Sequence, residues 1–303
     1  MQQPAATPFD DQYSFTAANP YLSRPESFLT NPLLHRDLTE SILALEAAVQ
    51  NDPTNGKAWL ALGLRQQENE NDSAAISAFR AALDADPEGA ADAWLAISAS
   101  YTNESRAADA YDALESWLRS SPAHRGSVER VEARTRGLSR HDAVTAMFLD
   151  AVRSAPGMEM DADIQVGLGV LFNVSEEYGK AVDCFEAALS KRPQDYMLWN
   201  KLGATLANSN QPDRAMDAYF NALSINPSYV RARYNLAVSC MQLGQHREAA
   251  EHLLGALAGQ AASIDHSVWS MLKIIADGHL GRHDLALACE RRDLSAFKGD
   301  FDF

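Results

Sequence analysis

The stretch that decides the fold reads Trp-Asn-Lys-Leu-Gly-Ala-Thr-Leu-Ala-Asn, residues 199–208. Apolar residues and one glycine recur in it at i, i+3, i+4 and i+7, which places them on one face of a helix: Trp199, Leu202, Gly203 and Leu206. Asn200 and Asn208 lie on another face, and Lys201 lies near the edge of that face. Because a carboxamide both donates and accepts hydrogen bonds, this polar face suits a peptide backbone or a carboxylate. The stretch therefore predicts a helix that packs with one face and binds with another.

Prolines recur along the chain at an almost constant interval. Six of them are 34 to 37 residues apart: Pro53, Pro87, Pro122, Pro156, Pro193 and Pro227. Each follows an alanine-containing helical run, at a point where a helix is expected to end. A period of 34 residues is the tetratricopeptide length, and the chain resembles that family at the marker positions as well. The pattern predicts an all-α tetratricopeptide-repeat superhelix.

The marker positions indicate how the two antiparallel helices of one repeat pack together. Small residues let the two helices approach closely: Gly63, Gly169 and Gly203 in first helices, and Ala75, Ala181, Ala215 and Ala249 in second helices. Large apolar residues fill the remaining space and reach the next repeat. Because no helix pair buries its apolar faces alone, the pairs must stack, and the first helices then line the concave side.

The pattern fails in three segments, which sets the expected domain organisation. Residues 1–19 are polar and aperiodic, so we expect a tail that is disordered or lies on the surface. Residues 20–122 form a first triplet of repeats, whose opening helix is weak, and residues 158–258 form a second triplet. Residues 259–303 lose the period and are expected to form a helical cap and a short tail.

The segment between the triplets, residues 123–157, keeps only the second half of a repeat. Its first half, residues 123–140, has two glycines, five arginines and little apolar periodicity. We interpret it as a degenerate fourth repeat that acts as a hinge between the triplets. The alternative is an ordinary exposed helix followed by a loose loop.

Composition excludes several classes of protein. The chain has 303 residues, with 26 basic against 41 acidic residues and a net charge of −15, which disfavours nucleic-acid binding and permits a basic ligand. No apolar run approaches the ~18 residues of a membrane span, and the N-terminus lacks the features of a secretory signal. Cys184, Cys240 and Cys289 are far apart, so we expect buried, reduced thiols in a cytosolic protein.

Polar residues recur at groove-facing positions of the first helices. Position 13 of the repeat holds Asn103, Asn208 and Gln242, position 6 holds Lys201 and Asn235, position 5 holds Asn200 and position 2 holds Arg231. Amides of this kind bind a main chain, and cations attract a carboxylate. Single amides are common on exposed helices, but their recurrence at matching positions favours a groove for an extended peptide.

Several strings resemble the C-terminal half of the peroxisomal import receptor that reads the type 1 peroxisomal targeting signal. They are Tyr-Thr-Asn-Glu-Ser at 101–105, Gly-Leu-Gly-Val-Leu-Phe-Asn at 167–173, Leu-Trp-Asn-Lys-Leu-Gly-Ala-Thr-Leu-Ala-Asn at 198–208, Arg-Ala-Arg-Tyr-Asn-Leu at 231–236 and His-Arg-Glu-Ala at 246–249. The likeness runs from about residue 20 to the end, and it includes the poor fourth repeat and the C-terminal helices.

The resemblance implies a receptor for the free C-terminus of cargo, a tripeptide such as Ser-Lys-Leu. Asn103, Asn200 and Asn235 align with the asparagines that hold the ligand's backbone and terminus, and Asn208 aligns with a further amide. Lys201 and Arg231 align with basic groups near the carboxylate, and Arg231 is expected to act through water.

Three further residues follow from the same alignment. Thr102 and Glu104 flank Asn103, and Glu104 is a reasonable partner for the cargo lysine. Gln242 stands where the family usually has asparagine, so its extra methylene either still reaches the ligand or loosens that contact.

Family receptors also carry a long N-terminal half that binds peroxisomal docking proteins, and the chain shows no such half. We expect either a fragment of a longer receptor or a relative without import activity of its own. The resemblance implies a cytoplasmic location with cycling to the peroxisomal membrane, without a membrane span.

Enzyme and metal sites are not indicated. The eight histidines are scattered, no cysteine has metal-ligand spacing, and neither a Gly-x-Ser-x-Gly motif nor a phosphate loop is present. We therefore expect no catalysis, no cofactor and no metal ion. The alternative function is a generic tetratricopeptide adaptor or scaffold. Its cochaperone form, which clamps an acidic tail with several cations, is disfavoured because the groove offers mainly amides.

Overall fold

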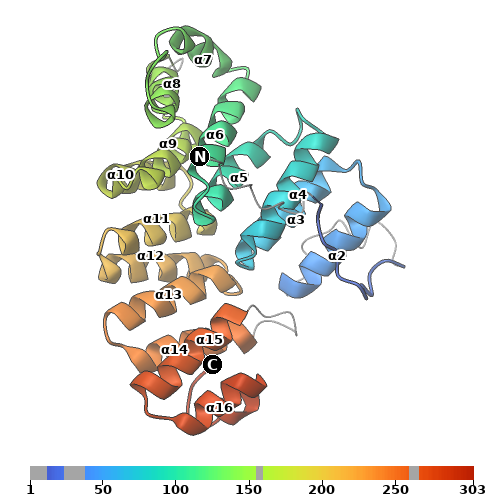
Figure 1. Ribbon diagram of the computed structural model, residues 1–303, viewed down its shortest axis with the longest axis vertical. Helices are drawn as coiled ribbons and strands as arrows, with labels where there is room; N and C mark the ends of the chain where they lie inside the picture. Colours follow the sequence, from blue (N-terminus) through green and yellow to red (C-terminus); the bar gives the residue numbers. More distant parts are fainter. Residues whose placement is uncertain (1–11, 24–37, 155–159, 259–265) are drawn as a thin grey trace, which may run out of the picture.

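The computed structural model describes residues 12–23, 38–154, 160–258 and 266–303, and all its regular elements within these ranges are helical (Figure 1). Parts of the predicted segments lie outside the described residues: the tail before residue 12, the weak first helix near 24–37, the end of the fourth repeat at 155–157 and the start of the cap at 259–265. No helix among the described residues is long and apolar enough to cross a membrane.

The helices follow one another in chain order: α2 (Leu38–Asn51), α3 (Gly56–Glu68), α4 (Asp72–Ala85), α5 (Asp92–Asn103), α6 (Ala107–Ser120), α7 (Arg125–Glu132), α8 (Arg140–Ser154), α9 (Ala162–Val174), α10 (Tyr178–Lys191), α11 (Tyr196–Asn208), α12 (Pro212–Ile225), α13 (Val230–Gln242), α14 (His246–Ala258), α15 (His266–Ile274), the π-helical turn η2 (Ile275–His279), α16 (His283–Arg291) and the 3₁₀ turn η3 (Leu294–Phe297).

Consecutive helices pack as pairs, and the pairs stack into a superhelix. The partners are α3 with α4, α5 with α6, α7 with α8, α9 with α10, α11 with α12 and α13 with α14. Figure 1 shows α9 to α14 layered down one side of the molecule, with α2 to α4 curling back beside them. The prediction of an all-α tetratricopeptide superhelix is confirmed.

Glycines in first helices set the closeness of each pair. A Cβ added to Gly63, Gly169 or Gly203 would lie 2.5 Å from the ring of Phe79, Phe185 or Tyr219, respectively, on the second helix of the same repeat. Atoms cannot approach so closely, so each ring occupies the space that only a glycine leaves. The prediction that these glycines allow close helix approach is confirmed.

A left-handed residue reverses the chain between the helices of most repeats. Positive φ angles of 57 to 61° occur at Glu70, Ser105, Glu176 and Asn210, and Gly244 has +74° at the matching place. This conformation is uncommon for residues with a Cβ. The repeat thus imposes it on side chains that do not favour it, and sequence reasoning did not identify these turns.

The array closes on itself, which positions the candidate site. Helix α3 contacts α13, although 164 residues separate Gln67 from Arg231. Val230 of α13 shares an apolar cluster with Trp59 and Leu62 of α3. The first described repeat therefore meets a late one, and the concave faces of the intervening first helices surround a central cavity.

The remaining segments flank this ring. Residues 12–23 lie against α2 and α3, where the Tyr13 hydroxyl donates to Glu46 Oε1 at 3.0 Å. The fourth helix pair has a first helix of only eight residues, α7, and its second helix α8 packs on α6 and α9. Whether this pair is a hinge stays a prediction.

The C-terminal segment is helical, and the cysteines agree with the prediction that they are buried and unbonded. Helix α15 packs on α14 and on α16, and α16 lies below α14 in Figure 1; that these helices cap the array stays a prediction. The three cysteines are free and buried, and burial raises their pKa to about 11, so they are protonated thiols at neutral pH.

Candidate functional site

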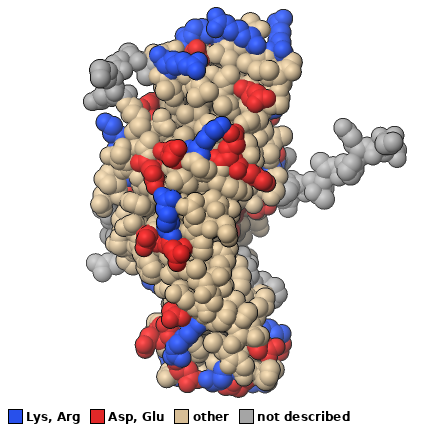
Figure 2. Space-filling model, turned by 90° about the vertical axis from the view of Figure 1, so that its left-hand side faces the viewer, with Lys and Arg blue, Asp and Glu red and all other residues tan. Residues whose placement is uncertain are grey.

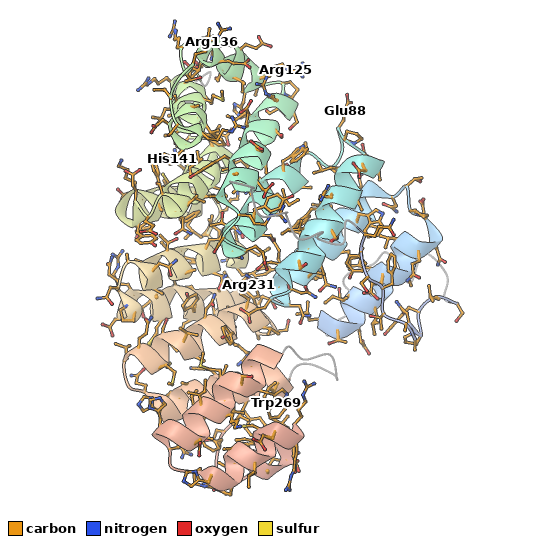
Figure 3. All side chains as sticks on the ribbon, in the orientation of Figure 1. Glu88, Arg125, Arg136, His141, Arg231 and Trp269 are labelled. Carbon is orange, nitrogen blue, oxygen red and sulfur yellow. The ribbon has the colours of Figure 1, made fainter. Side chains whose placement is uncertain are left out.

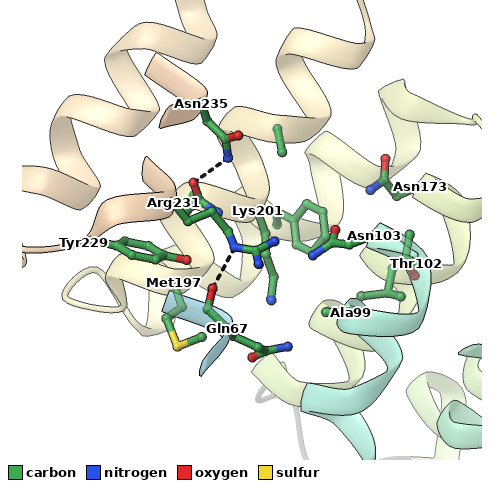
Figure 4. A pocket seen from close by; sticks show the side chains of 14 residues that line it. Gln67, Ala99, Thr102, Asn103, Asn173, Met197, Lys201, Tyr229, Arg231 and Asn235 are labelled. Atoms are coloured by element: carbon green, nitrogen blue, oxygen red, sulfur yellow. Dashed lines mark hydrogen bonds between the residues drawn. The ribbon is translucent and has the colours of Figure 1, made fainter. Parts of the chain in front are cut away.

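The candidate site is the cavity enclosed by the first helices of the ring (Figure 4). Helices α3, α5, α9, α11 and α13 each contribute side chains. Its lining comprises Gln67, Ala99, Thr102, Asn103, Val170, Asn173, Phe185, Met197, Asn200, Lys201, Ala204, Tyr229, Arg231 and Asn235. Amides, two cations and a few apolar side chains thus meet at one place.

Six of the nine residues proposed from the sequence line this cavity: Thr102, Asn103, Asn200, Lys201, Arg231 and Asn235. The other three do not appear in its lining. Asn208 and Gln242 are the last residues of α11 and α13, Glu104 directly follows α5, and all three are exposed. The structure therefore does not bring these three side chains together with the other six.

A buried carboxylate organises one wall of the cavity. Asp72, the first residue of α4, is only 6% exposed, and its Oδ2 accepts from Arg231 Nη2 at 2.8 Å and from Asn103 Nδ2 at 3.0 Å. Arg231 Nε also donates to the backbone carbonyl of Gln67 at 2.7 Å (Figure 4). Arg231 is therefore held by the chain's own acid, whereas the sequence predicted that it attracts a ligand carboxylate.

The charge of Arg231 is stabilised in this setting. Burial is the largest influence and by itself lowers the pKa of the guanidinium. The negative charges of Asp72 and Glu70 outweigh it, so that the pKa of Arg231 lies above its usual value. Arg231 is thus a fixed, compensated cation.

Two asparagines form a pair across neighbouring repeats. Asn235 Nδ2 on α13 donates to Asn200 Oδ1 on α11 at 3.1 Å (Figure 4). Asn200 is 5% exposed, and its side-chain Nδ2 donates to none of the described residues. The pair fixes the Asn200 side chain and leaves its donors available to a ligand.

Lys201 differs from Arg231 because it has no counter-ion in contact. Its ammonium makes no ion pair or hydrogen bond with any described residue. Burial is the main cause that lowers the pKa of Lys201, Arg231 lowers it further, and the more distant Asp195 and Asp72 oppose the shift. The cavity therefore contains a desolvated cation without a contacting anion. Its desolvation costs free energy, and an anionic ligand would offset that cost.

Sequence reasoning missed two carboxamides of the lining, Gln67 and Asn173. Each has a buried side-chain oxygen without a hydrogen-bond partner among the described residues. Both stand three residues before the left-handed turn of their repeat, at Glu70 and Glu176, whereas Asn103 stands two residues before Ser105. In the repeat frame, Gln67 and Asn173 stand at position 12, directly before position 13, which holds Asn103. Polar residues at position 12 would therefore have pointed to both.

Comparisons with known proteins identify the repeat and the relatives. Residues 34–90 match the family model described as tetratricopeptide repeat, and residues 175–256 match the model described as anaphase-promoting complex, cyclosome, subunit 3. Solved structures resemble the chain only weakly. A MamA structure has 18% identity and a TM-score of 0.44 over 58% of this chain and 91% of that one.

Curated relatives are far more similar. The chain is 42% identical to the peroxisomal targeting signal receptor of Candida albicans over 88% of its length, and 35% identical to that of Saccharomyces cerevisiae over 96%. A rat PEX5-related protein is 39% identical over 66% of the chain. The chain spans about half the length of the two yeast relatives, 48% and 51%, and 35% of the rat one.

The two yeast relatives are named as receptors, and the matches with them cover 88% and 96% of the chain. Together with the repeat fold, this shows that the chain is a tetratricopeptide-repeat homologue of the peroxisomal targeting signal receptors, over about half of their length.

Proposed function

We propose that the chain is a cargo-recognition unit for peroxisomal import and that its central cavity binds the free C-terminal tripeptide of cargo, of the Ser-Lys-Leu type. The observation that carries the proposal is Lys201, a partly buried ammonium without a contacting anion in a cavity lined by amides. A terminal carboxylate supplies the missing charge and forms a charge-assisted hydrogen bond.

The amides of the cavity suit the rest of a bound tripeptide. Asn200 and Asn103 can donate to carbonyl oxygens of its main chain, and the unpartnered oxygen of Asn173 can accept from one of its amides. Apolar side chains of Val170, Phe185 and Met197 offer a surface for a leucine side chain. Main-chain groups of an extended terminus would then find partners, as burial of a peptide requires.

Arg231 has a supporting role in this proposal. Because Asp72 and the Gln67 carbonyl hold its guanidinium, it joins α13 to α3 and α4 and closes the ring around the ligand. It also adds to the positive potential at Lys201, since its charge lowers the pKa of that side chain. In the cell this role places the chain in the cytoplasm, cycling to the peroxisomal membrane with cargo and docking proteins as partners.

The proposal is tested by fluorescence anisotropy with a labelled peptide that ends in Ser-Lys-Leu. The control peptide has the same sequence extended by one C-terminal glycine, which moves the carboxylate away from the tripeptide. We expect saturable binding of the first peptide and a loss of at least tenfold for the second, since a charge-assisted hydrogen bond contributes ~1.5–3 kcal/mol. Equal affinities, or binding of neither peptide, would favour the generic adaptor instead.

A further inference from the structure

The end of the molecule formed by α7, α8 and their connection is unusually basic. Residues 123–154 contain six arginines against four carboxylates, whereas the whole chain has 26 basic against 41 acidic residues. Figure 2 shows Lys and Arg side chains gathered at the top of the molecule, the end that α7 and α8 occupy in Figure 1. The proposed cargo function does not use this end.

Most of these arginines have no ion-pair partner. Two are engaged, Arg130 with Asp150 at 2.6 Å and Arg140 with Asp112 at 2.5 Å. The other four are exposed and pair with no described residue: Arg125, Arg134, Arg136 and Arg153. We call these four the free arginines. Figure 3 shows Arg136 at the tip of this end and Arg125 at its side.

The carboxylates of the same segment do not neutralise the free arginines. Asp150 is taken by Arg130, and Glu132 is taken by Arg119 at 3.3 Å. Asp142 accepts from the Ser139 hydroxyl at 2.7 Å. Glu129 is the remaining acid, and it is exposed on α7. The surface at this end therefore carries an excess of positive charge.

Exposed apolar side chains accompany the charge. Leu138, in the α7–α8 connection, is 52% exposed, and Leu149 and Val152 on α8 are 37% and 42% exposed. They are three of the nine large apolar side chains that are exposed among the described residues. Leu138 follows Gly137, whose φ of +92° is a conformation that L residues rarely adopt, and it stands within four residues of Arg134 and Arg136 in the same connection.

We propose that the α7–α8 end binds the surface of an anionic membrane, with the free arginines on lipid headgroups and Leu138 inserted among them. Basic residues next to an exposed apolar side chain are the combination that peripheral membrane proteins use. The net charge of −15 does not prevent this, because charges farther than ~8–10 Å from the membrane are screened at physiological salt.

The shape of the surface favours a membrane over an acidic polypeptide. Helices α7 and α8 form a protruding end of the molecule, where Figure 3 shows Arg125 and Arg136, and such an end can touch a flat surface at several points (Figures 1 and 3). An acidic peptide would gain little from Leu138, Leu149 and Val152, whereas a bilayer takes up apolar side chains at its interface. Binding of an acidic peptide is therefore kept as the competing outcome.

The test is co-sedimentation of the intact chain with vesicles of phosphatidylcholine, alone or mixed with phosphatidylserine. We expect binding only to the mixed vesicles and release at high salt. The variant Arg134→Gln/Arg136→Gln should lower the partition coefficient about 30-fold, because each basic residue near an anionic surface contributes ~1 kcal/mol. Leu138→Ser should also lower it, without removing the salt dependence.

A charge-matched control keeps the test specific. Lys180→Gln/Arg214→Gln removes two cations that are 61% and 53% exposed on α10 and α12, away from the α7–α8 end. Arg214 on α12 is the more remote of the two, since Lys180 pairs with Glu177, which also contacts His141 of α8. The single variant Arg214→Gln is therefore included, and both control variants should bind the mixed vesicles as the parent does. Equal losses in both double variants would overturn the proposal, because they would reflect net charge alone. Absence of vesicle binding would also overturn the proposal. So would a chain that binds a polyglutamate peptide through Arg134 and Arg136 but does not bind the vesicles.

Discussion

Replacing Lys201 with methionine should make the chain more stable and a worse receptor at the same time. Methionine keeps the length of the side chain and removes its charge. Burial lowers the pKa of Lys201 below the ordinary 10.5, so the folded state holds the charged form less well than the unfolded state does. At neutral pH this lysine therefore reduces the free energy of unfolding. Its cost is greatest below its folded pKa and is relieved as the pH rises through that value.

The size of the two effects follows from the contacts. Lys201 has no ion pair to lose among the described residues, so Lys201→Met should raise the free energy of unfolding by ~1 kcal/mol or more. If Lys201 holds the ligand carboxylate, the variant loses a charge-assisted hydrogen bond of ~1.5–3 kcal/mol, which is about 10- to 150-fold in affinity. Stability and binding should thus change in opposite directions, which general damage to the fold cannot produce.

The assay is a double-mutant cycle between protein and ligand. Parent and Lys201→Met are each titrated with a Ser-Lys-Leu peptide in its acid form and in its C-terminally amidated form, and their thermal melts are recorded. The acid peptide should lose affinity in the variant, while the amide peptide, already weak, should lose little more. The control is Lys180→Met, which removes an exposed lysine on α10.

The reasoning would be refuted if the losses from Lys201→Met and from amidation were additive. Additive losses would mean that the lysine and the carboxylate do not meet. A lower melting temperature for Lys201→Met would contradict the electrostatic part separately.

Four further predictions follow from the same cavity and its frame. Asn200→Ala should weaken peptide binding by ~1–3 kcal/mol with folding intact. Asn200→Asp should weaken binding more, because it places a negative charge against the cargo carboxylate; a peptide titration and a thermal melt check both variants. Asp72→Asn should lower the free energy of unfolding by ~3 kcal/mol or more, measured by denaturant titration, because it leaves Arg231 without its counter-ion. Saturating peptide should slow proteolysis within residues 123–140 if that segment is a hinge, and identical digests would count against it. Because the pKa of Lys201 is lowered, the affinity for the acid peptide should fall as the pH rises, at pH values where an ordinary lysine is still protonated. The variant Lys201→Arg should keep its affinity over the same pH range.

The repeat fold was predictable because its determinants are local. The spacing of prolines and the glycine-to-ring contacts, such as Gly203 against Tyr219, repeat within each unit of about 34 residues. Residues on the concave faces of first helices could be assigned by repeat position, and six of the nine proposed side chains do line one cavity.

The rest of the site could not be predicted, because it depends on how the array closes. Asp72 and Arg231 are 159 residues apart, and their contact exists only because the superhelix brings α4 to α13. Sequence position alone marks Asp72 as an acid in the first turn of a helix, which is a common stabilising feature. The extent of the cavity was equally hidden, so that Glu104, Asn208 and Gln242 could not be recognised as absent from its lining.

A crystal structure of the chain with a Ser-Lys-Leu peptide tests the central claim most directly. The account predicts that the terminal carboxylate lies ~2.8 Å from Lys201 Nζ, as a charge-assisted hydrogen bond requires, with the Asn200 amide on the peptide's main chain and Arg231 still paired with Asp72. A peptide whose C-terminus lies outside this cavity, or whose carboxylate contacts neither Lys201 nor an asparagine of its wall, would contradict it.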